Sequence, residues 1–317
     1  MMLGSAKKGF MNGLRVTWLL GKVIFPITLI VAFLQHTPVL PWVIDLIAPF
    51  MSIFGLSGDA AIPLVLGNAL NLYAGIGAIL TLDLTVKEVF TIALMLGFAH
   101  SMFIETGVAM KVGVKLWIVI LVRYGLAFLS GILVNLLWQG GSQPAQYGFM
   151  SGAPQVENIT GWGPILLEAL QQATMGIIQL ALIVFPLMVL IQILKDVHII
   201  DIFSKKMSPI TRALGMHENT STTLTAGLLF GLAYGAGVMI QASKEDGVSK
   251  KDLTIAFVFL CACHAVIEDT LIFLPLGVPV VPLLLIRLGT AIALTIIVAV
   301  VWRRTELSRR KEVTYEQ

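Results

Sequence analysis

Residues 97–106 read Gly-Phe-Ala-His-Ser-Met-Phe-Ile-Glu-Thr, and residues 261–270 read Cys-Ala-Cys-His-Ala-Val-Ile-Glu-Asp-Thr. Each stretch lies in a long apolar run and places a histidine five residues before an acid that is followed at once by threonine. Ionisable residues are rare in such runs, because a charge at the centre of a bilayer costs about 2.5–3.5 kcal/mol on insertion scales. Two runs with the same polar residues at the same spacing therefore indicate an internal duplication.

The duplication extends in both directions from these stretches. Downstream, Arg123 and Arg287 keep the offset of 164 residues, and upstream of a four-residue insertion the offset becomes 160. The chain is therefore expected to consist of two homologous halves, residues 16–139 and 162–304, joined by a linker at 140–161. Further matched pairs are Pro26/Pro186, Pro49/Pro209, Gly55/Gly215, Gly67/Gly227, Gly75/Gly235, Gly77/Gly237, Gly113/Gly277 and Gly125/Gly289.

The composition is that of a membrane protein. Of the 317 residues, 57% are hydrophobic and only 12% are charged, and the mean hydropathy is +0.91. A soluble domain cannot bury so much apolar surface, whereas a helix of about 20 apolar residues can cross the hydrocarbon core of a bilayer. The sequence therefore predicts an all-α, multi-pass fold. The apolar runs cover residues 16–34, 60–82, 89–110, 116–138, 177–194, 224–240, 255–274 and 280–302.

Several classes of protein are disfavoured. The first apolar run lacks a cleavage site typical of a signal peptide, and two cysteines, Cys261 and Cys263, cannot form a disulfide framework. The net charge of +3 resides in loops and tails, which does not indicate nucleic-acid binding. We find no Gly-rich phosphate loop and no nucleophile–base–orienter set, so neither a cofactor nor an enzymatic activity is expected. Energy for any transport would come from a gradient or from another subunit.

Basic loop residues indicate orientation, since cytoplasmic loops carry the excess of Lys and Arg. Both termini, residues 1–15 and 305–317, are expected in the cytoplasm, because the linker has no Lys or Arg whereas both ends have several. These are Lys7, Lys8 and Arg15 at the N-terminus and Arg303, Arg304, Arg309, Arg310 and Lys311 at the C-terminus. Equivalent loops carry opposite signals: residues 36–57 have no Lys or Arg, whereas residues 195–216 have four. The turn 111–115 has two lysines, and its partner 275–279 has no charge. Opposite signals at equivalent loops predict two inverted-topology repeats.

Each inverted repeat must cross the membrane an odd number of times, yet each has about four apolar segments. One segment per half is therefore expected to be re-entrant or broken. The candidates are the Gly-rich segments, 60–82 and 224–240, and the His-acid segments, 89–110 and 255–274. Residues 40–56 and 198–215 are expected to form interfacial helices.

The candidate substrate-binding residues are the polar residues inside these segments. A histidine or a buried carboxylate there would carry a coupling proton, and an acid–Arg pair across each hairpin is geometrically feasible. The alternative is that these pairs only neutralise one another and lock the hairpins. The Gly-rich segments permit either close helix packing or an unwound stretch that binds a solute. The candidates are Asn68, Asn71, Tyr73, His100, Glu105, Thr106 and Arg123 in the first half, and Tyr234, His264, Glu268, Asp269, Thr270 and Arg287 in the second.

A metal site is a weaker alternative. Cys261 and Cys263 align with Gly97 and Ala99, so their thiols are not part of the duplicated design. A His/carboxylate site shared by both halves has competent ligands but no metal-specific spacing. It would use His100, Glu105, His264 and Asp269.

The order of the motifs resembles the nucleoside-recognition, or gate, domain family, which includes spore maturation proteins A and B and the gate domains of ferrous-iron transporter B. The resemblance rests on Asn71-Leu72-Tyr73-Ala74-Gly75-Ile76-Gly77 and on residues 100–106, and it covers both halves. It implies a bacterial or archaeal cytoplasmic (inner) membrane protein with a transporter-like core. The chain lacks the GTP-binding domain of the iron transporter.

The function expected from these observations is secondary transport of a small polar or anionic solute by alternating access, with coupling to protons. The alternatives are a divalent-metal permease, a lipid-phosphate flippase and a non-transporting membrane assembly protein. The expected partners are the lipid bilayer, a small-molecule or ion substrate and a second copy of the chain, but not nucleic acid.

Overall fold

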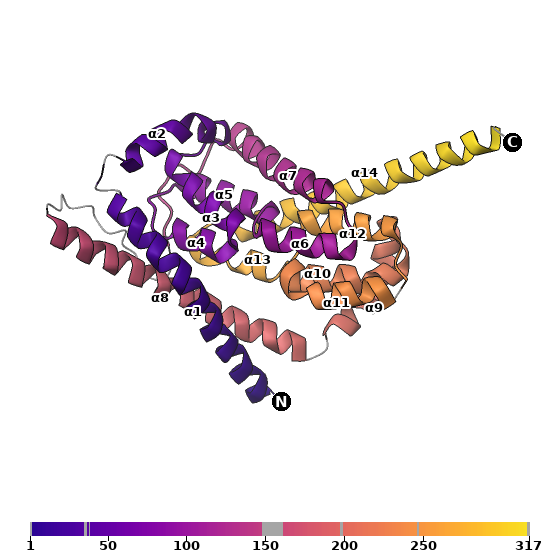
Figure 1. Ribbon diagram of the computed structural model, residues 1–317, viewed down its shortest axis with the longest axis horizontal. Coiled ribbons are helices and arrows are strands. Elements are labelled where there is room, and N and C mark those ends of the chain that lie inside the picture. The colour runs from indigo at the N-terminus through magenta and orange to yellow at the C-terminus, as the bar shows by residue number, and fades with distance from the viewer. Residues whose placement is uncertain are drawn as a thin grey trace. The chain divides into compact units, whose positions relative to one another are not determined.

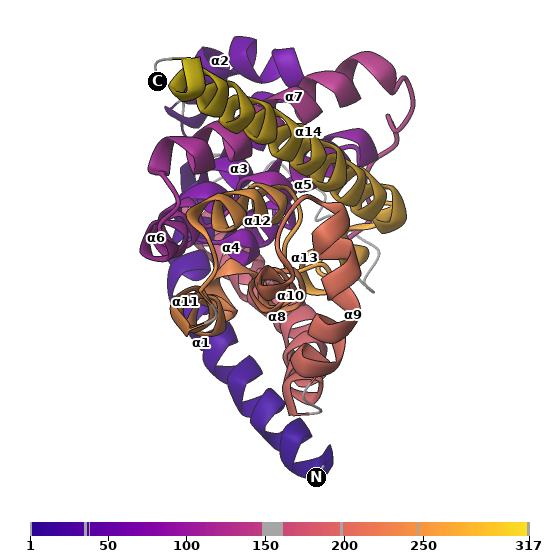
Figure 2. The ribbon, with the colours of Figure 1, turned by 90° about the vertical axis from the view of Figure 1, so that its right-hand side faces the viewer.

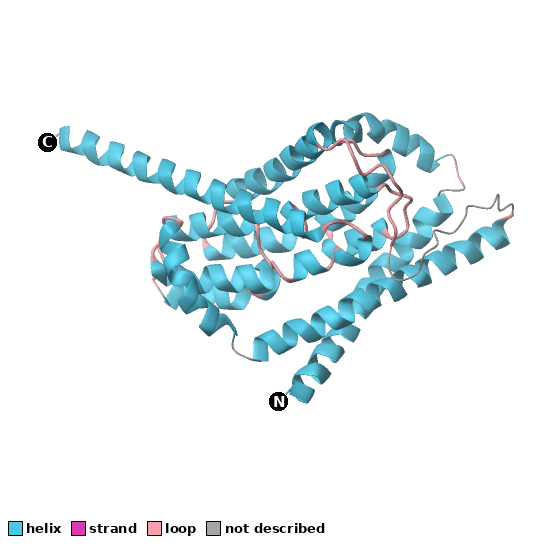
Figure 3. Cartoon of the chain, turned by 180° about the vertical axis from the view of Figure 1, so that it is seen from behind, coloured by secondary structure: helices cyan, strands magenta, loops and turns pink. Residues whose placement is uncertain are grey.

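The computed structural model describes residues 2–34, 37, 39–147, 161–196, 199–245 and 247–315. These residues form helices joined by turns and loops and have no sheet (Figure 3), apart from one isolated antiparallel bridge between Thr85 and Pro144. The all-α class is thus confirmed for the described residues. Most of the expected linker, residues 148–160, lies outside them.

The helices follow one another as labelled in Figure 1. Before the expected linker lie α1 (Met2–Leu34), α2 (Val39–Met51), α3 (Ala61–Ala69), α4 (Leu72–Ile79), α5 (Val86–Phe98), α6 (Met102–Val112) and α7 (Leu116–Leu137). After it lie α8 (Trp162–Asp196), α9 (Ile199–Ala213), α10 (Ser221–Tyr234), α11 (Ala236–Glu245), α12 (Lys250–Ala262), α13 (Glu268–Leu271) and α14 (Val280–Tyr315). Short 3-10 turns occupy Ser52–Phe54, Gly58–Ala60, Glu218–Thr220 and Leu274–Leu276.

Three helical segments among the described residues are long and apolar enough to cross a bilayer, namely Val86–Val112, Leu116–Leu137 and Val280–Thr305. The pair Ile44–Phe54 and Gly58–Ala69 would be a fourth, but its two parts are bent by 84° at a short break. These spans are consistent with a multi-pass membrane protein.

The chain divides into two compact units that cut across the two halves of the sequence. Unit 1 comprises Met1–Phe103, Tyr124–Val197 and Glu268–Leu283. Unit 2 comprises Ile104–Arg123, His198–Ile267 and Leu284–Gln317. Each unit therefore contains the histidine of one half together with the acidic helix of the other half.

Within unit 1, α1 and α8 lie side by side (Figure 1). Gly9 and Gly13 permit this close approach. A Cβ at Gly9 would lie 2.5 Å from Val189 Cα, and one at Gly13 would lie 2.9 Å from the Phe185 ring. Small residues at such contacts let helix backbones approach within van der Waals distance, which is how helices associate when lipid replaces water.

The His-acid segment is broken at the same position in each half. Helix α5 ends at Phe98, and Ser101 then has a φ of 48° and donates its backbone N–H to Gly67 O at 2.9 Å. The equivalent residue in unit 2 is Ala265, which has a φ of 44° and donates to Gly227 O at 3.1 Å. A positive φ is unusual for residues other than glycine. Its recurrence at equivalent positions indicates that the break is part of the duplicated fold.

The Gly-rich segment is also interrupted in each half. In unit 1, Asn71 has an extended backbone between α3 and α4, and its side-chain oxygen caps α4 by accepting from Ala74 N at 3.0 Å. In unit 2, the equivalent Gly231 has φ 76° and ψ 175° and interrupts α10. Both segments that the sequence offered as candidates for a break are therefore interrupted.

The glycines of these segments provide both non-helical backbone and close packing. Gly231 provides the non-helical backbone of the break. Gly75 and Gly235 provide close packing, since a Cβ at Gly75 would lie 3.0 Å from Pro63 O and one at Gly235 would lie 2.6 Å from Gly231 O.

Candidate functional site

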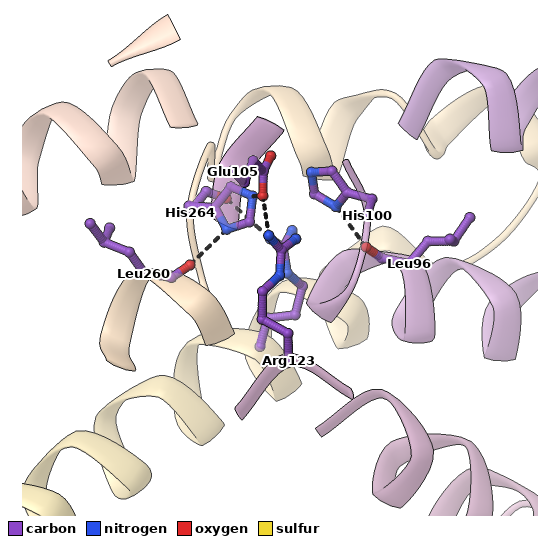
Figure 4. Close-up of polar contacts among 7 residues, drawn as sticks. Leu96, His100, Glu105, Arg123, Leu260 and His264 are labelled. Atoms are coloured by element: carbon purple, nitrogen blue, oxygen red, sulfur yellow. Dashed lines mark hydrogen bonds and ion pairs between the residues drawn. The ribbon is translucent and has the colours of Figure 1, made fainter. Parts of the chain in front are cut away.

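A buried ionic cluster in unit 2 joins residues from both halves of the sequence. Arg123 on α7 lies 2.5 Å from Glu105 on α6, as Figure 4 shows, and both side chains are almost completely buried. His264, which follows α12, places its Nε2 atom 3.3 Å from the same carboxylate oxygen of Glu105. The hairpin of the first half thus brings an acid and a guanidinium to the histidine of the second half.

The backbone around the break holds His264 in this position. Its Nδ1 atom contacts Leu260 O at 2.7 Å (Figure 4), and its own carbonyl oxygen accepts from Arg287 Nη2 at 3.1 Å. A carbonyl only accepts hydrogen bonds, so Nδ1 carries a hydrogen and Nε2 faces Glu105. If the imidazole is neutral and the carboxylate is ionised, His264 Nε2 and the Glu105 oxygen that faces it are both hydrogen-bond acceptors. The contact is favourable only when a proton resides on Nε2 or on Glu105.

The break in α10 lies directly against this cluster. A Cβ at Gly231 would lie 3.0 Å from Ala265 Cβ and 3.7 Å from His264 Cδ2. Non-helical backbone has N–H and C=O groups that the helix does not satisfy, and such backbone is tolerated at membrane depth only when it is buried in protein or lines a cavity. Two interrupted segments and three ionisable side chains therefore meet within unit 2.

Unit 1 repeats part of this arrangement. His100 is buried, and its Nδ1 atom contacts Leu96 O at 2.7 Å (Figure 4), as His264 contacts Leu260. Asp269, on α13, is buried as well. The ring orientation of the histidine is therefore duplicated together with its sequence position.

One hydrogen bond in unit 1 breaks the duplication. Tyr73 on α4 donates its hydroxyl to Glu268 on α13, and both residues are buried. The residues at the equivalent positions are Ala233 and Ile104, which are apolar and exposed. The Tyr73–Glu268 pair thus distinguishes unit 1 from unit 2 at the level of side-chain chemistry.

Substitution Tyr73→Phe is expected to lower the free energy of unfolding by about 1.5–3 kcal/mol, because it removes a buried hydrogen bond to an acidic side chain. Thermal unfolding of the full chain in detergent measures the effect. Tyr124→Phe is the matched control and should change stability by less than about 0.5 kcal/mol, since no hydrogen bond of the Tyr124 hydroxyl to a described residue is present. Equal stabilities of the two variants would contradict the assignment.

The remaining candidates are placed as follows. Asn68 on α3 donates from its amide to Leu64 O at 2.9 Å, and its side-chain oxygen has no hydrogen-bond partner among the described residues. Thr106 and Thr270 are equivalent residues, and each has a buried hydroxyl that likewise lacks a partner within the described parts of the chain. The side chain of Tyr234 lies outside the described residues.

Sequence reasoning missed the groups that fix the histidine rings. The carbonyl oxygens of Leu96 and Leu260 orient His100 and His264, and both lie four residues before the ring that they hold. A histidine just after the end of a helix, four residues beyond a helical residue, is a pattern that could have predicted this contact between ring nitrogen and carbonyl oxygen. No comparable sequence pattern predicts that residues 104–123 of the first half pack in unit 2, or that residues 268–283 of the second half pack in unit 1.

Comparison with known proteins gives a consistent assignment. The family model described as Gate, nucleoside recognition, matches residues 17–115 and 177–291, so that one matched stretch falls in each half. The chain is 57% identical over 296 residues to a Bacillus subtilis (strain 168) protein named "Uncharacterized membrane protein YvoD". The match covers 93% of this chain and 94% of that protein. No solved structure matches the chain.

Proposed function

The chain belongs to the Gate, or nucleoside-recognition, family of membrane proteins, and from this premise we propose that it is a secondary transporter. It moves a small polar or anionic solute across the cytoplasmic membrane by alternating access of two inverted repeats. The observation that carries the proposal is the buried cluster of Glu105, Arg123 and His264, which both halves build beside the backbone break at Gly231.

The inverted arrangement is supported by the opposite charge of segments at equivalent positions of the two halves. Unit 2 contains the basic turn 111–115, the basic helix α9 and the exposed Arg303 and Arg304 of α14. Unit 1 contains the equivalents of the first two, residues 275–279 and α2, which have no Lys or Arg. By the positive-inside rule the segments with Lys or Arg are expected on the cytoplasmic side, and their equivalents without Lys or Arg on the outer side.

The cluster supplies a mechanism for coupling solute to protons. Arg123 binds Glu105 when the carboxylate is ionised. A proton delivered through His264 neutralises Glu105, and the guanidinium then becomes available to an anionic group of the solute. Solute and ionised Glu105 thus compete for Arg123. Binding of the solute is therefore linked to protonation of Glu105.

Flux measurements in proteoliposomes test this function. Vesicles loaded with a pH-sensitive dye are exposed to nucleosides, amino acids, mono- and dicarboxylates or inorganic phosphate. We expect at least one class to move protons with the wild type. Arg123→Lys, which keeps the charge but loses the planar fork that binds an anion by two hydrogen bonds, is expected to reduce this flux about tenfold or more.

The variant Glu105→Gln separates proton coupling from solute binding. It is expected to retain uptake of the radiolabelled solute but to lose the proton signal, because glutamine cannot ionise. If no class moves protons or label with folded wild type above protein-free vesicles, the transport proposal is wrong and the cluster is a structural lock.

A divalent-metal permease is the second candidate, favoured by the convergence of the Glu105 carboxylate and the His264 imidazole, which are both competent metal ligands. It ranks lower because the guanidinium of Arg123 contacts the same carboxylate oxygen and would repel a cation. Metal-dependent thermal stabilisation that His264→Ala abolishes would reverse this ranking.

A further inference from the structure

Helix α9 of unit 2 presents two different faces. One face packs on the protein: Ser204 contacts the hydroxyls of Ser221 and Thr222 at 3.2 and 3.3 Å, and Met207 and Thr211 are buried. Figure 2 shows α9 beside α10. The opposite face is exposed, and its residues must therefore suit the surroundings of the protein.

The exposed face of α9 combines apolar and basic side chains. Phe203 and Ile210, two turns apart, are 36% and 49% exposed. Lys206 is exposed one turn from each of them, and Lys205 and Arg212 are exposed farther round the helix. Neither lysine forms an ion pair with a described residue, and Arg212 lies 4.0 Å from Glu218, where both are exposed. An exposed pair at that distance contributes little, so most of the positive charge is available to a partner.

The equivalent helix, α2 in unit 1, has the opposite character. Asp45 stands where α9 has Lys205, and Leu46 stands where α9 has Lys206. Helix α2 exposes Trp42, Leu46 and Phe50 along one side, each about two-thirds exposed. Since the two helices derive from one duplicated element, the basic residues of α9 are not required by the fold.

We propose that α9 is a binding site for anionic lipid headgroups. Phe203 and Ile210 insert at the boundary between headgroups and acyl chains, and Lys205, Lys206 and Arg212 contact the phosphates. Lysine suits this position because its methylene stem lies along apolar surface while its ammonium group reaches the phosphate. Helix α2, with Asp45 and no basic residue, does not select anionic lipid.

Native mass spectrometry of the full chain, titrated with phosphatidylglycerol or phosphatidylcholine, tests the proposal. We expect tighter binding of phosphatidylglycerol to the wild type. Each lysine near an anionic headgroup should contribute about fivefold in affinity, so Lys205→Gln with Lys206→Gln should weaken phosphatidylglycerol binding about 25-fold. Binding of phosphatidylcholine should not change.

Two matched variants assign the effect to α9. Lys205→Arg with Lys206→Arg keeps the charge and should keep the affinity. Lys111→Gln with Lys115→Gln removes two exposed lysines of the same unit from a turn and should leave the affinity unchanged. Equal binding of the two lipids by the wild type, full retention of phosphatidylglycerol affinity in Lys205→Gln with Lys206→Gln, or an equal loss in the turn variant would overturn the proposal.

Discussion

Arg123→Ala is expected to lower the free energy of unfolding by about 3–5 kcal/mol, because it removes one partner of a buried ion pair. Glu105 would remain buried, without the guanidinium that lies 2.5 Å away in the wild type. Unfolding of the full chain in detergent, by heat or by denaturant, measures the loss. Arg303→Ala is the matched control, since Arg303 is exposed on α14, and it should change stability by less than about 0.5 kcal/mol.

A double-mutant cycle of Arg123→Met and Glu105→Gln separates the pair from its surroundings. Removing both charges leaves no unpaired ion, so the double variant should be more stable than the sum of the single losses by about 2 kcal/mol or more. Additive losses would show that the two residues act independently, which contradicts a shared cluster.

The variant Arg123→Lys distinguishes a transport site from a structural lock. Arg123→Lys retains the positive charge beside Glu105 and should retain most of the stability. If the pair is only a structural lock, it requires only the positive charge beside Glu105, so Arg123→Lys would leave the flux unchanged. A solute site requires the guanidinium geometry, so flux falls although the protein remains folded.

Gly235→Ala is expected to destabilise the fold by about 3 kcal/mol or more, at the upper end of the range for overpacking. The added methyl group would lie 2.6 Å from Gly231 O and 2.9 Å from Ala226 O. Both are backbone atoms and cannot move aside as a flexible side chain would. Thermal unfolding in detergent measures the loss.

Gly237→Ala is a control only two residues away. A Cβ at Gly237 would have no neighbour within 4 Å among the described residues. Alanine favours helix over glycine by about 0.5–1 kcal/mol, so this variant should be neutral or slightly more stable. If the two substitutions had the same effect, the close packing of the Gly-rich segment around Gly231 would be ruled out.

Much of the local structure could be predicted from the sequence. The pairs at offsets of 160 and 164 identified the residues that occupy equivalent positions, and the structure places matching breaks at Ser101 and Ala265. The capping box of Thr85 and Glu88 at the start of α5 is likewise a local pattern. Such features depend on residues that are close in sequence and on which residues are buried. The periodicity and composition of the sequence indicate both.

By itself, the sequence determined the helical class, the duplicated pattern and the identity of the polar residues within apolar runs. Only the tertiary structure decided that residues 104–123 pack in unit 2, where Glu105 meets His264, and that residues 268–283 pack in unit 1, where Tyr73 donates to Glu268. The physical reason is that these contacts join residues more than 150 positions apart. A hydrophobic pattern specifies which face of a helix is buried, but the packing of whole helices selects the partner against which that face is buried.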